Sequence, residues 1–287
     1  MLKLDEKKIR KGKPIGLPYQ GSKKKISKKI IEIIKQNFGT DKPIYDIFGG
    51  GGAITAECIL NNLDVHYNDL DRDIVDMFQR VISQDREWIK TLIVNREEFF
   101  EIKNKDIKTV DDNLKLLVNS FGNKKNSYLY SAEWSDVKYT LAIEIINKHD
   151  VFSGYRQTET WLNQYRELQQ LERLQQLERL QQLEQLQQLE QLQATNLSYE
   201  AFSDIENSIL YLDPPYENTT HESYTGDFDS QAFYDWVFEM SKKNTVLISS
   251  YEISDDRFKC VYEFEKARST MQGGGAGKTE KLFMAVH

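Results

Sequence analysis

Four consecutive residues combine a carboxylate, a rigid backbone and an aromatic ring: Asp213, Pro214, Pro215 and Tyr216. They follow the apolar segment 209–212, which predicts a buried strand. Two prolines cannot continue the hydrogen bonds of a strand, so they fix a turn where it ends. In α/β proteins that end of the strand is where ligands bind. The four residues are therefore candidates for a reaction site, and a purely structural turn with a cis-proline is the alternative.

The chemistry that suits this turn is group transfer to an amine on a flat heterocycle. Asp213 and the Pro214 carbonyl can accept hydrogen bonds from an NH2 group while Tyr216 stacks on the ring. The lone pair of such an amine is delocalised into the ring, so acceptors that draw on its hydrogens favour its nucleophilic form. A methyl sulfonium donor held in line with that lone pair would gain much of its rate from this positioning.

A glycine-rich segment, 49–52, lies between a predicted strand and a predicted helix. Glycines let the backbone approach a ligand closely, and the helix N-terminus supplies unpaired amides. Asp46 ends the strand before this loop, and Asp69 ends the next strand 23 positions later. A carboxylate at the second place suits the hydroxyls of a ribose, so the spacing fits either NAD or S-adenosylmethionine.

Alternating apolar strands and amphipathic helices at the two ends of the chain predict a doubly wound, Rossmann-like α/β sheet. Ser22 is expected to cap the first helix, and residues 1–17 are expected to be a flexible leader. The helices are predicted at 22–38, 53–60 and 230–242, and the strands at 44–48, 65–67, 209–212, 245–249, 260–264 and 281–286, the last two as a closing pair.

A leucine repeat follows the middle of the chain, 72–165, which is helical in pattern. From Leu168 to Leu192 a leucine stands at every third position, in a six-residue unit close to LQQLER. Its residues are good helix formers, so a helix is expected. A strict three-residue step turns the leucine stripe by about −60° per leucine around that helix. This argues against a coiled coil, which needs steps of three and four; stacked solenoid turns are the alternative.

The charge distribution indicates a polyanionic partner despite a net charge of −7 over 287 residues. Residues 1–29 hold eleven Lys and Arg against Asp5 and Glu6, a net +9, so the remaining chain carries −16. A basic arm on an acidic body can contact phosphates. A solvated tail without a partner is the alternative.

Cysteine, histidine and apolar content exclude several classes of protein. Cys58 and Cys260 lack metal-ligand spacing, and the four histidines are scattered. No apolar run is long enough for a membrane span. We therefore expect free thiols in a reducing compartment, no metal site and no membrane.

Taken together, these residues resemble a known family, the Dam-type (α-group) DNA adenine-N6 methyltransferases, in which cofactor motifs precede the catalytic motif. The resemblance covers residues 17–75 and 196–287. Its motifs occur in order: an aromatic-x-Gly-x-Lys element at 19–23, a D-x-F-x-G-x-G loop at 46–52, the acid Asp69, a Ser-Tyr pair at 198–199 and a DPPY box at 213–216. The leucine repeat is similar to repeats in phage-type members.

The resemblance implies a fold, a reaction and a set of site residues. The fold is the Rossmann-like sheet of S-adenosylmethionine-dependent methyltransferases with a helical insert. The reaction moves the methyl group of S-adenosyl-L-methionine to the N6 amine of an adenine in double-stranded DNA. The catalytic residues it implies are Asp213, Pro214, Pro215 and Tyr216. The cofactor-binding residues it implies are Tyr19, Lys23, Asp46, Phe48, Gly50, Gly52, Asp69, Tyr199 and Asp213.

The resemblance also implies that two parts of the chain have different roles. The catalytic domain is expected at 1–75 and 196–287, and a target-recognition insert at 76–195, including the repeat at 165–193. The target adenine has to be flipped out of the duplex, and the loop 217–228 is expected to order on DNA binding. The basic arm and the insert are the candidate DNA contacts, and the repeat is a candidate for self-association. The repeat keeps the recognition rules of other members from being carried over.

Other interpretations of the same residues stay open. The acceptor of the same fold could be cytosine N4, an RNA adenine or a protein glutamine, although those groups more often carry Ser or Asn in place of Asp213. A non-catalytic DNA-binding or assembly protein is a further class. The expected location is the cytoplasm of a bacterial or phage-infected cell, with restriction–modification, regulation and phage genome protection all open as roles.

Overall fold

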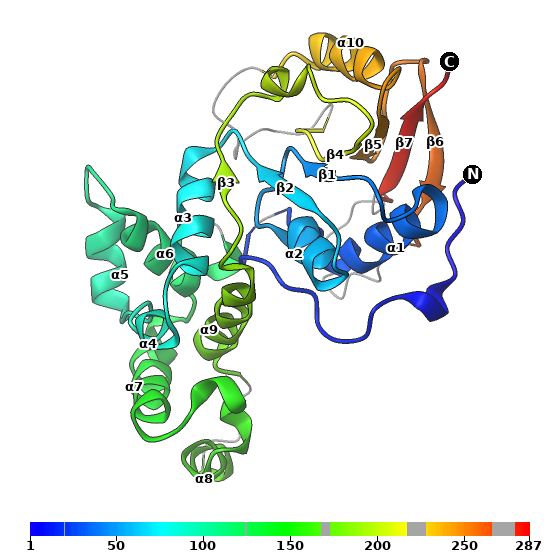
Figure 1. Cartoon of the computed structure of the whole chain (residues 1–287). Coiled ribbons are helices and arrows are strands. Elements are labelled where there is room, and N and C mark those ends of the chain that lie inside the picture. Colours follow the sequence, from blue (N-terminus) through cyan, green and yellow to red (C-terminus); the bar gives the residue numbers. More distant parts are fainter. Residues whose placement is uncertain (20, 124, 168–172, 217–227, 266–278) are drawn as a thin grey trace. The chain divides into compact units, whose positions relative to one another are not determined.

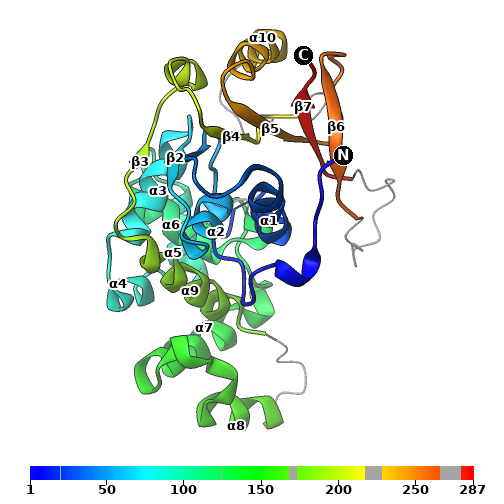
Figure 2. The ribbon, with the colours of Figure 1, turned by 45° about the vertical axis from the view of Figure 1, so that its right-hand side comes forward.

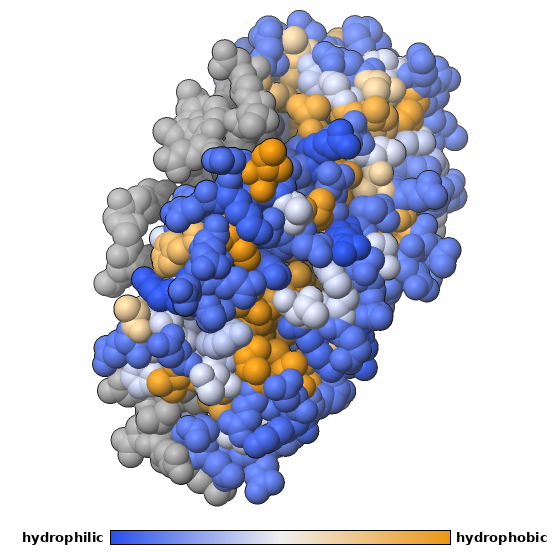
Figure 3. All heavy atoms as spheres, turned by 90° about the vertical axis from the view of Figure 1, so that its left-hand side faces the viewer, coloured by the Kyte–Doolittle hydropathy of each residue, from blue (hydrophilic) through white to orange (hydrophobic). Residues whose placement is uncertain are grey.

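The computed structural model describes residues 1–19, 21–123, 125–167, 173–216, 228–265 and 279–287, and the chain forms two compact units. The first, here called the sheet unit, comprises Met1–Pro14, Lys23–Val75 and Leu192–His287; the second, the helical unit, comprises Ile15–Ser22 and Asp76–Gln191. None of the described helices is long and apolar enough to cross a membrane. The face in Figure 3 is mainly hydrophilic, with apolar side chains in separate patches, as is usual for protein surfaces.

The sheet unit contains one seven-stranded sheet in the order β3-β2-β1-β4-β5-β7-β6 (Figure 1). The strands are β1 (Ile44–Asp46), β2 (Val65–Asn68), β3 (Ala194–Thr195), β4 (Ile209–Leu212), β5 (Thr245–Ser250), β6 (Phe258–Glu263) and β7 (Lys281–Ala285). Strands β1 to β5 pair in parallel, and β7 runs antiparallel to β5 and β6. The order changes direction between β1 and β4, the switch point at which doubly wound sheets bind ligands. The predicted Rossmann-like α/β fold is confirmed.

Helices cover both faces of this sheet (Figure 2). They are α1 (Ser27–Phe38), α2 (Ala53–Leu60) and α10 (Ser230–Met240), with the short turns η1 (Glu6–Lys8), η2 (Lys23–Lys25) and η7 (Tyr199–Phe202). In β4, Ile209 and Tyr211 pack with α1 and α2, whereas Leu210 and Leu212 pack with α10. Successive strand residues point to opposite faces, so a strand covered on both sides is apolar throughout. This explains why β4 could be recognised from its sequence.

The predicted element ends differ from the observed ones in instructive places. Helix α2 and strand β4 match their predicted ranges residue for residue, and β6 and β7 form the expected closing pair. The sequence predicts a first helix capped by Ser22, but α1 begins at Ser27 after the separate turn η2, and Ile26 makes no side-chain cap. That cap prediction is wrong. Strand β3 is not predicted, because two residues carry no periodic signal.

The N-terminal arm, residues 1–14, is fixed to the sheet unit, so the predicted flexible leader is wrong. The Leu2 amide donates to the Val261 carbonyl at 2.8 Å and extends the sheet by one contact. The Lys3 amide donates to Asn37 Oδ1 at 2.9 Å, and Asn37 Nδ2 donates back to the Lys3 carbonyl at 2.8 Å. Backbone pairing with a side chain at the end of α1 leaves no trace in a charge pattern, which is why the sequence misses it.

The helical unit confirms the helical pattern predicted for the middle of the chain. Its helices are α3 (Arg72–Ile82, which begins in the sheet unit), α4 (Arg86–Lys90), α5 (Arg96–Lys103), α6 (Val110–Asn119), α7 (Ala132–Lys148), α8 (Glu159–Glu167) and α9 (Gln175–Leu186). Short turns join them at η3 (Phe121–Asn123), η4 (Val151–Ser153), η5 (Tyr155–Gln157) and η6 (Gln187–Leu189).

Helix α9 contains most of the described part of the leucine repeat, and it is a core helix. Leu177, Leu180, Leu183 and Leu186 are each 0% exposed. A stripe that winds around a helix is buried only when neighbours surround it, and α4, α6 and η4 all pack on α9. The predicted helix is confirmed here, and solenoid turns are excluded for this part of the repeat. The first two leucines, at 168 and 171, lie outside the described residues.

A polar residue of the repeat is buried beside these leucines and caps a neighbouring helix. Arg179 donates from Nη1 to the carbonyls of Leu117 (3.2 Å), Val118 (2.6 Å) and Ser120 (2.8 Å). The last carbonyls of a helix lack partners within it, so Arg179 supplies the missing donor at the end of α6. Burial lowers the pKa of Arg179 to about 10, which still leaves the side chain charged at neutral pH.

Arg179→Met should lower the free energy of unfolding by about 2–3 kcal/mol, because buried carbonyls lose a charged donor. Arg173 stands six positions earlier at the same place in the repeat and pairs near the surface with Glu178. Arg173→Met should therefore cost less than about 1 kcal/mol. Urea denaturation followed by circular dichroism measures both variants. Equal losses would contradict the capping role of Arg179.

Candidate active site

The glycine loop follows β1 and leads into α2. Gly49 stands against β2, where an added Cβ would lie 2.3 Å from Cε2 of Tyr67, so a side chain has no room. Gly50 and Gly52 have φ values of 48° and 72°, in the left-handed region that favours glycine. Gly52 is also the N-cap residue of α2. The loop is thus built from backbone alone, which allows a ligand to approach it closely.

Asp69 ties the end of β2 to this loop. Its Oδ2 accepts a hydrogen bond from the Gly50 amide at 2.7 Å, and its Oδ1 accepts one from the Asp71 amide at 2.8 Å. The Tyr67 hydroxyl adds a bond to the Gly50 carbonyl at 2.8 Å. Burial raises the pKa of Asp69 to about 6, although the two amides act in the opposite direction. Two predicted cofactor-binding residues, Gly50 and Asp69, are therefore in direct contact.

Asp46 lies beneath the loop and is 1% exposed. Its Oδ2 accepts hydrogen bonds from the amide and the hydroxyl of Thr55 in α2, at 3.1 and 2.6 Å. Burial raises the pKa of Asp46 to about 7. The contact that the structure gives this residue holds α2 against β1 and so positions the loop.

Phe48 and Tyr199 meet in an aromatic cluster next to the loop. Their rings stack with centroids 6.4 Å apart, and Phe233 lies edge-on to both, at 5.6 and 5.3 Å. Trp236 lies edge-on to Tyr199 at 5.0 Å. Aromatic faces of this kind can flank a flat heterocycle.

Lys23 joins the turn 213–216, here called the DPPY turn, to the start of β7. Its Nζ lies 2.6 Å from Asp213 Oδ2 and 3.9 Å from Glu280 Oε1, and it donates to the Tyr216 hydroxyl at 2.6 Å. That hydroxyl lies 3.0 Å from Asp213 Oδ1 and 2.6 Å from Glu280 Oε1. A hydroxyl has one hydrogen, so Tyr216 donates to only one carboxylate at a time. We call these four residues the Lys23 cluster.

The Lys23 cluster places two carboxylates against one ammonium where little water reaches. The side chains of Lys23, Asp213 and Glu280 are 11%, 17% and 15% exposed. Burial by itself lowers the pKa of Lys23, but the two carboxylates outweigh it and the pKa is raised. Burial raises the pKa of Asp213, and Lys23 opposes that rise. Burial and the carboxylates raise the pKa of Tyr216. Such perturbed groups are typical of reaction sites.

Glu280 is the residue of this cluster that the sequence does not reveal. It directly precedes β7, whose antiparallel pairing with β5 sets it beside Ser249. The Ser249 hydroxyl donates to Glu280 Oε1 at 2.7 Å. Tyr251, just after β5, packs its ring against Tyr216 with centroids 4.7 Å apart. Because the pairing of β5 with β7 is a non-local property, an acid before the last strand carries no signal in the sequence.

The remaining predictions concern residues outside these groups. Tyr19 is the one predicted site residue that belongs to the helical unit, and its amide donates to the Leu17 carbonyl at 2.8 Å. Pro214 and Pro215 are buried in the DPPY turn, and every described peptide bond is trans. Among the described residues, no three His, Cys, Asp or Glu side chains are grouped to hold a metal ion. Residues 217–227 of the predicted mobile loop lie outside the described residues.

The raised pKa values of Asp46 and Asp69 predict that stability falls as pH rises. Between the ordinary value of 3.8 and about 7, the folded chain keeps protons that the unfolded chain has released, so the unfolding free energy decreases. The slope for each fully differing carboxyl is about 1.4 kcal/mol per pH unit. Asp46→Asn should flatten this slope most above about pH 6, where more than half of Asp69 is already ionised.

Urea denaturation at intervals from pH 5 to pH 8 measures that slope. Asp204→Asn, which changes an exposed aspartate, is the matched control and should keep the wild-type slope. A wild-type slope in Asp46→Asn would show that Asp46 is ionised in the folded chain throughout this range.

Known proteins were compared with the chain at the level of structure, sequence and family. Among solved structures, the rRNA methyltransferase aviRa from Streptomyces viridochromogenes matches 90% of this chain and 84% of its own at 11% identity. Its TM-score of 0.37 is too low to support an argument. No curated protein matches. The family model of the D12 class N6 adenine-specific DNA methyltransferases matches residues 19–271, a span that holds the glycine loop, Asp69 and the DPPY turn. The chain belongs to the D12 class of N6 adenine-specific DNA methyltransferases.

Proposed function

We propose that the chain transfers the methyl group of S-adenosyl-L-methionine to the N6 amine of an adenine that is flipped out of double-stranded DNA. Its family makes it a DNA adenine-N6 methyltransferase, and the proposal adds the residues that do the work. The observation that carries the proposal is the Lys23 cluster. It holds the Asp213 carboxylate beside one ammonium, at the end of β4, the strand next to β1 and its glycine loop.

The residues around the glycine loop fit S-adenosyl-L-methionine. The Asp69 carboxylate can accept hydrogen bonds from ribose hydroxyls, and the faces of Phe48 and Tyr199 suit an adenine ring. The backbone at Gly50 and Gly52 admits a close ligand. When bound, the cofactor supplies an electrophilic methyl group on a sulfonium. In addition, the family resemblance assigns cofactor contacts to Tyr19 and Lys23, while Asp46 acts on the loop through its bonds to Thr55.

The DPPY turn binds the acceptor amine. Lys23 occupies Asp213 Oδ2, and the Tyr216 hydroxyl lies against Oδ1. When Tyr216 donates to Glu280 instead, Oδ1 is left to accept a hydrogen of the target amine, and the Pro214 carbonyl accepts the other. Glu280 is therefore a positioning residue.

The proton of the amine also has a destination in this site. The bound cofactor would supply the methyl group, and its sulfur would leave with the electrons of the broken bond while N6 takes the methyl carbon. N6 then loses a proton, which passes to Asp213. The raised pKa of Asp213 makes it a better acceptor than an ordinary carboxylate.

An adenine inside a duplex cannot reach this turn, so the base has to leave the stack. The ring of Tyr216 replaces the lost stacking, an interaction worth about 1–3 kcal/mol. The insert at 76–195 then selects the target. Within it, α9 acts as a scaffold, because Leu177 and Leu183 are buried and leave no leucine face for a second chain. We place this activity in a bacterial or phage-infected cell, where it marks DNA for restriction–modification, regulation or phage protection.

Transfer of tritium from labelled S-adenosylmethionine to duplex DNA tests this function, with the label expected in N6-methyladenine. Asp213→Ala should lower kcat by about 10²–10⁴-fold, because the acceptor for the amine proton is gone. Asp204→Ala, on an exposed aspartate, should leave kcat unchanged. Retained turnover in Asp213→Ala would remove this carboxylate from the mechanism.

The role of Glu280 has a separate signature. Glu280→Gln should lower kcat by about tenfold or more with little change in KM for DNA, because a neutral amide oxygen accepts more weakly than a carboxylate and the Tyr216 hydroxyl then competes with the target amine for Asp213. Ser249→Ala, which removes another bond to the same carboxylate, should have a smaller effect on kcat. An increase in KM alone would assign Glu280 to substrate binding and contradict the positioning role.

A further inference from the structure

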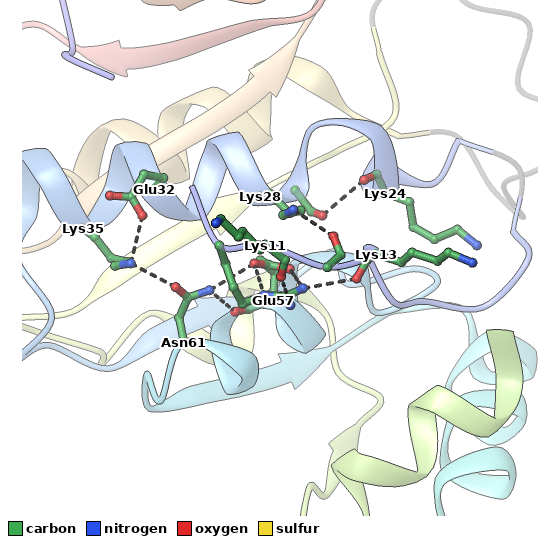
Figure 4. Close-up of polar contacts among 11 residues, drawn as sticks. Lys11, Lys13, Lys24, Lys28, Glu32, Lys35, Glu57 and Asn61 are labelled. Atoms are coloured by element: carbon green, nitrogen blue, oxygen red, sulfur yellow. Dashed lines mark hydrogen bonds and ion pairs between the residues drawn. The ribbon is translucent and has the colours of Figure 1, made fainter. Parts of the chain in front are cut away.

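The sheet unit carries exposed lysines on two segments that are separate in the sequence. Lys11 and Lys13 lie in the N-terminal arm, and Lys25 lies in η2, with Lys24 half-buried beside it. We call these four residues the basic strip. Figure 4 shows the side chains of Lys13 and Lys24 extending in the same direction, away from the polar network that holds the arm. The arm and η2 thus each present one ammonium group on this side, that of Lys13 and that of Lys24.

A buried acid fixes the arm in this place. Glu57 of α2 is 1% exposed, and its two carboxylate oxygens accept bonds from Arg10 Nε and Nη2, both at 2.8 Å (Figure 4). Asn61 Nδ2 donates to Glu57 Oε1 at 3.1 Å. The bond to Glu57 raises the pKa of Arg10. A bidentate pair of this kind fixes the orientation of the Arg10 guanidinium as well as its position.

The same guanidinium also shapes the backbone that carries the lysines. Arg10 Nη1 donates to the Lys11 carbonyl at 2.7 Å, and Nη2 donates to the Lys13 carbonyl at 3.2 Å. Lys28 Nζ adds a bond from α1 to the Gly12 carbonyl at 2.9 Å. The backbone of residues 10–13 is therefore wrapped around Arg10, so the side chains of Lys11 and Lys13 are left exposed.

The basic strip directly adjoins the Lys23 cluster in the sequence. Lys24 and Lys25 follow Lys23 within the same turn η2, and Lys23 Nζ lies 2.6 Å from Asp213. A nucleotide whose base reaches the DPPY turn therefore has its backbone phosphates near η2. Phosphates attract ammonium groups without regard to sequence, which positions a nucleic acid without reading it.

We propose that the basic strip binds the phosphates beside the flipped adenine, and that Glu57 acts on DNA from inside the protein by holding the arm in register with η2. The inference rests on the proposed function for its partner, double-stranded DNA. Glu57→Gln removes a negative charge, which by net charge alone favours a polyanion, yet it should weaken DNA binding because the arm loses its anchor.

Binding of the full-length protein to a fluorescent duplex, measured from low to high salt, tests the proposal. The slope of log affinity against log salt changes by about 0.9 for each phosphate contact. The triple variant Lys13→Gln, Lys24→Gln, Lys25→Gln should lose about 2–3 units of slope, and Lys259→Gln, on the exposed side of β6, should keep the wild-type slope. Glu57→Gln should bind about threefold or more weakly, with a shallower slope.

Thermal melting of each variant separates a local from a global effect. If Glu57→Gln unfolds, Lys13→Gln alone, which leaves the Glu57 contacts in place, should still lose about one unit of slope. An unchanged slope in the triple variant, or equal or tighter binding by a folded Glu57→Gln, would overturn the proposal. Methyl transfer by the wild type is scored separately. If the wild type methylates DNA but the lysine variants keep the wild-type salt slope, only the binding of phosphates by the basic strip is refuted. If the lysine variants have reduced slopes but the wild type transfers no methyl group, only the proposed function is refuted.

Discussion

One buried ammonium supports the whole site. Asp213 after β4 and Glu280 before β7 lie close together where little water reaches, and both burial and the charge of Glu280 raise the pKa of Asp213. Lys23 contacts both carboxylates and opposes this rise, and it also donates to the Tyr216 hydroxyl. Because Lys23 lies in η2, near the start of the chain, the same contact joins the N-terminal segment to strands far along the sequence. A change at any of these four residues therefore affects both the packing of the sheet unit and its chemistry.

The parallel sheet explains why the other site residues gather around this cluster. Strand β1 pairs with β2 on one side and β4 on the other, so the loops that follow all three lie at one edge of the sheet. This brings Asp46, Asp69 and Asp213 near one another. Burial is the main reason why the pKa of each is raised; neighbouring carboxylates add to the rise, and Lys23 opposes it at Asp213. A cation bound near these carboxyl groups would favour their ionised form. The parallel pairing of β1 with β2 and β4 thus gathers three carboxyl groups of raised pKa at one edge of the sheet.

The sequence predicts what depends on short-range patterns and misses what depends on long-range pairing. Strand β4 is recognisable because both of its faces are apolar, and the glycine loop because only glycine fits against Tyr67 and at the positive φ of Gly52. Glu280 is not recognisable, since only the antiparallel pairing of β5 with β7 brings it to the DPPY turn. The arm is misjudged for a related reason: a run of lysines looks solvated, whereas its position is set by Arg10 and a buried acid on α2. The leucine repeat is an intermediate case. Its helix can be predicted from its residue types, but the burial of that helix on all sides cannot, because it depends on the helices packed around it.

The stability of Lys23→Met as a function of pH tests the central claim most directly. If Lys23 keeps Asp213 charged, its removal leaves that buried carboxylate without a counter-ion, which costs about 3–5 kcal/mol. That cost should be largest at pH 8 and should shrink as the pH falls toward 5, because Asp213, whose pKa is raised by burial, then takes up a proton and no longer needs the ammonium. Urea denaturation of Lys23→Met and wild type across this range gives the difference at each pH. A large, pH-dependent loss is the predicted result, and a small loss that is the same at every pH would contradict it.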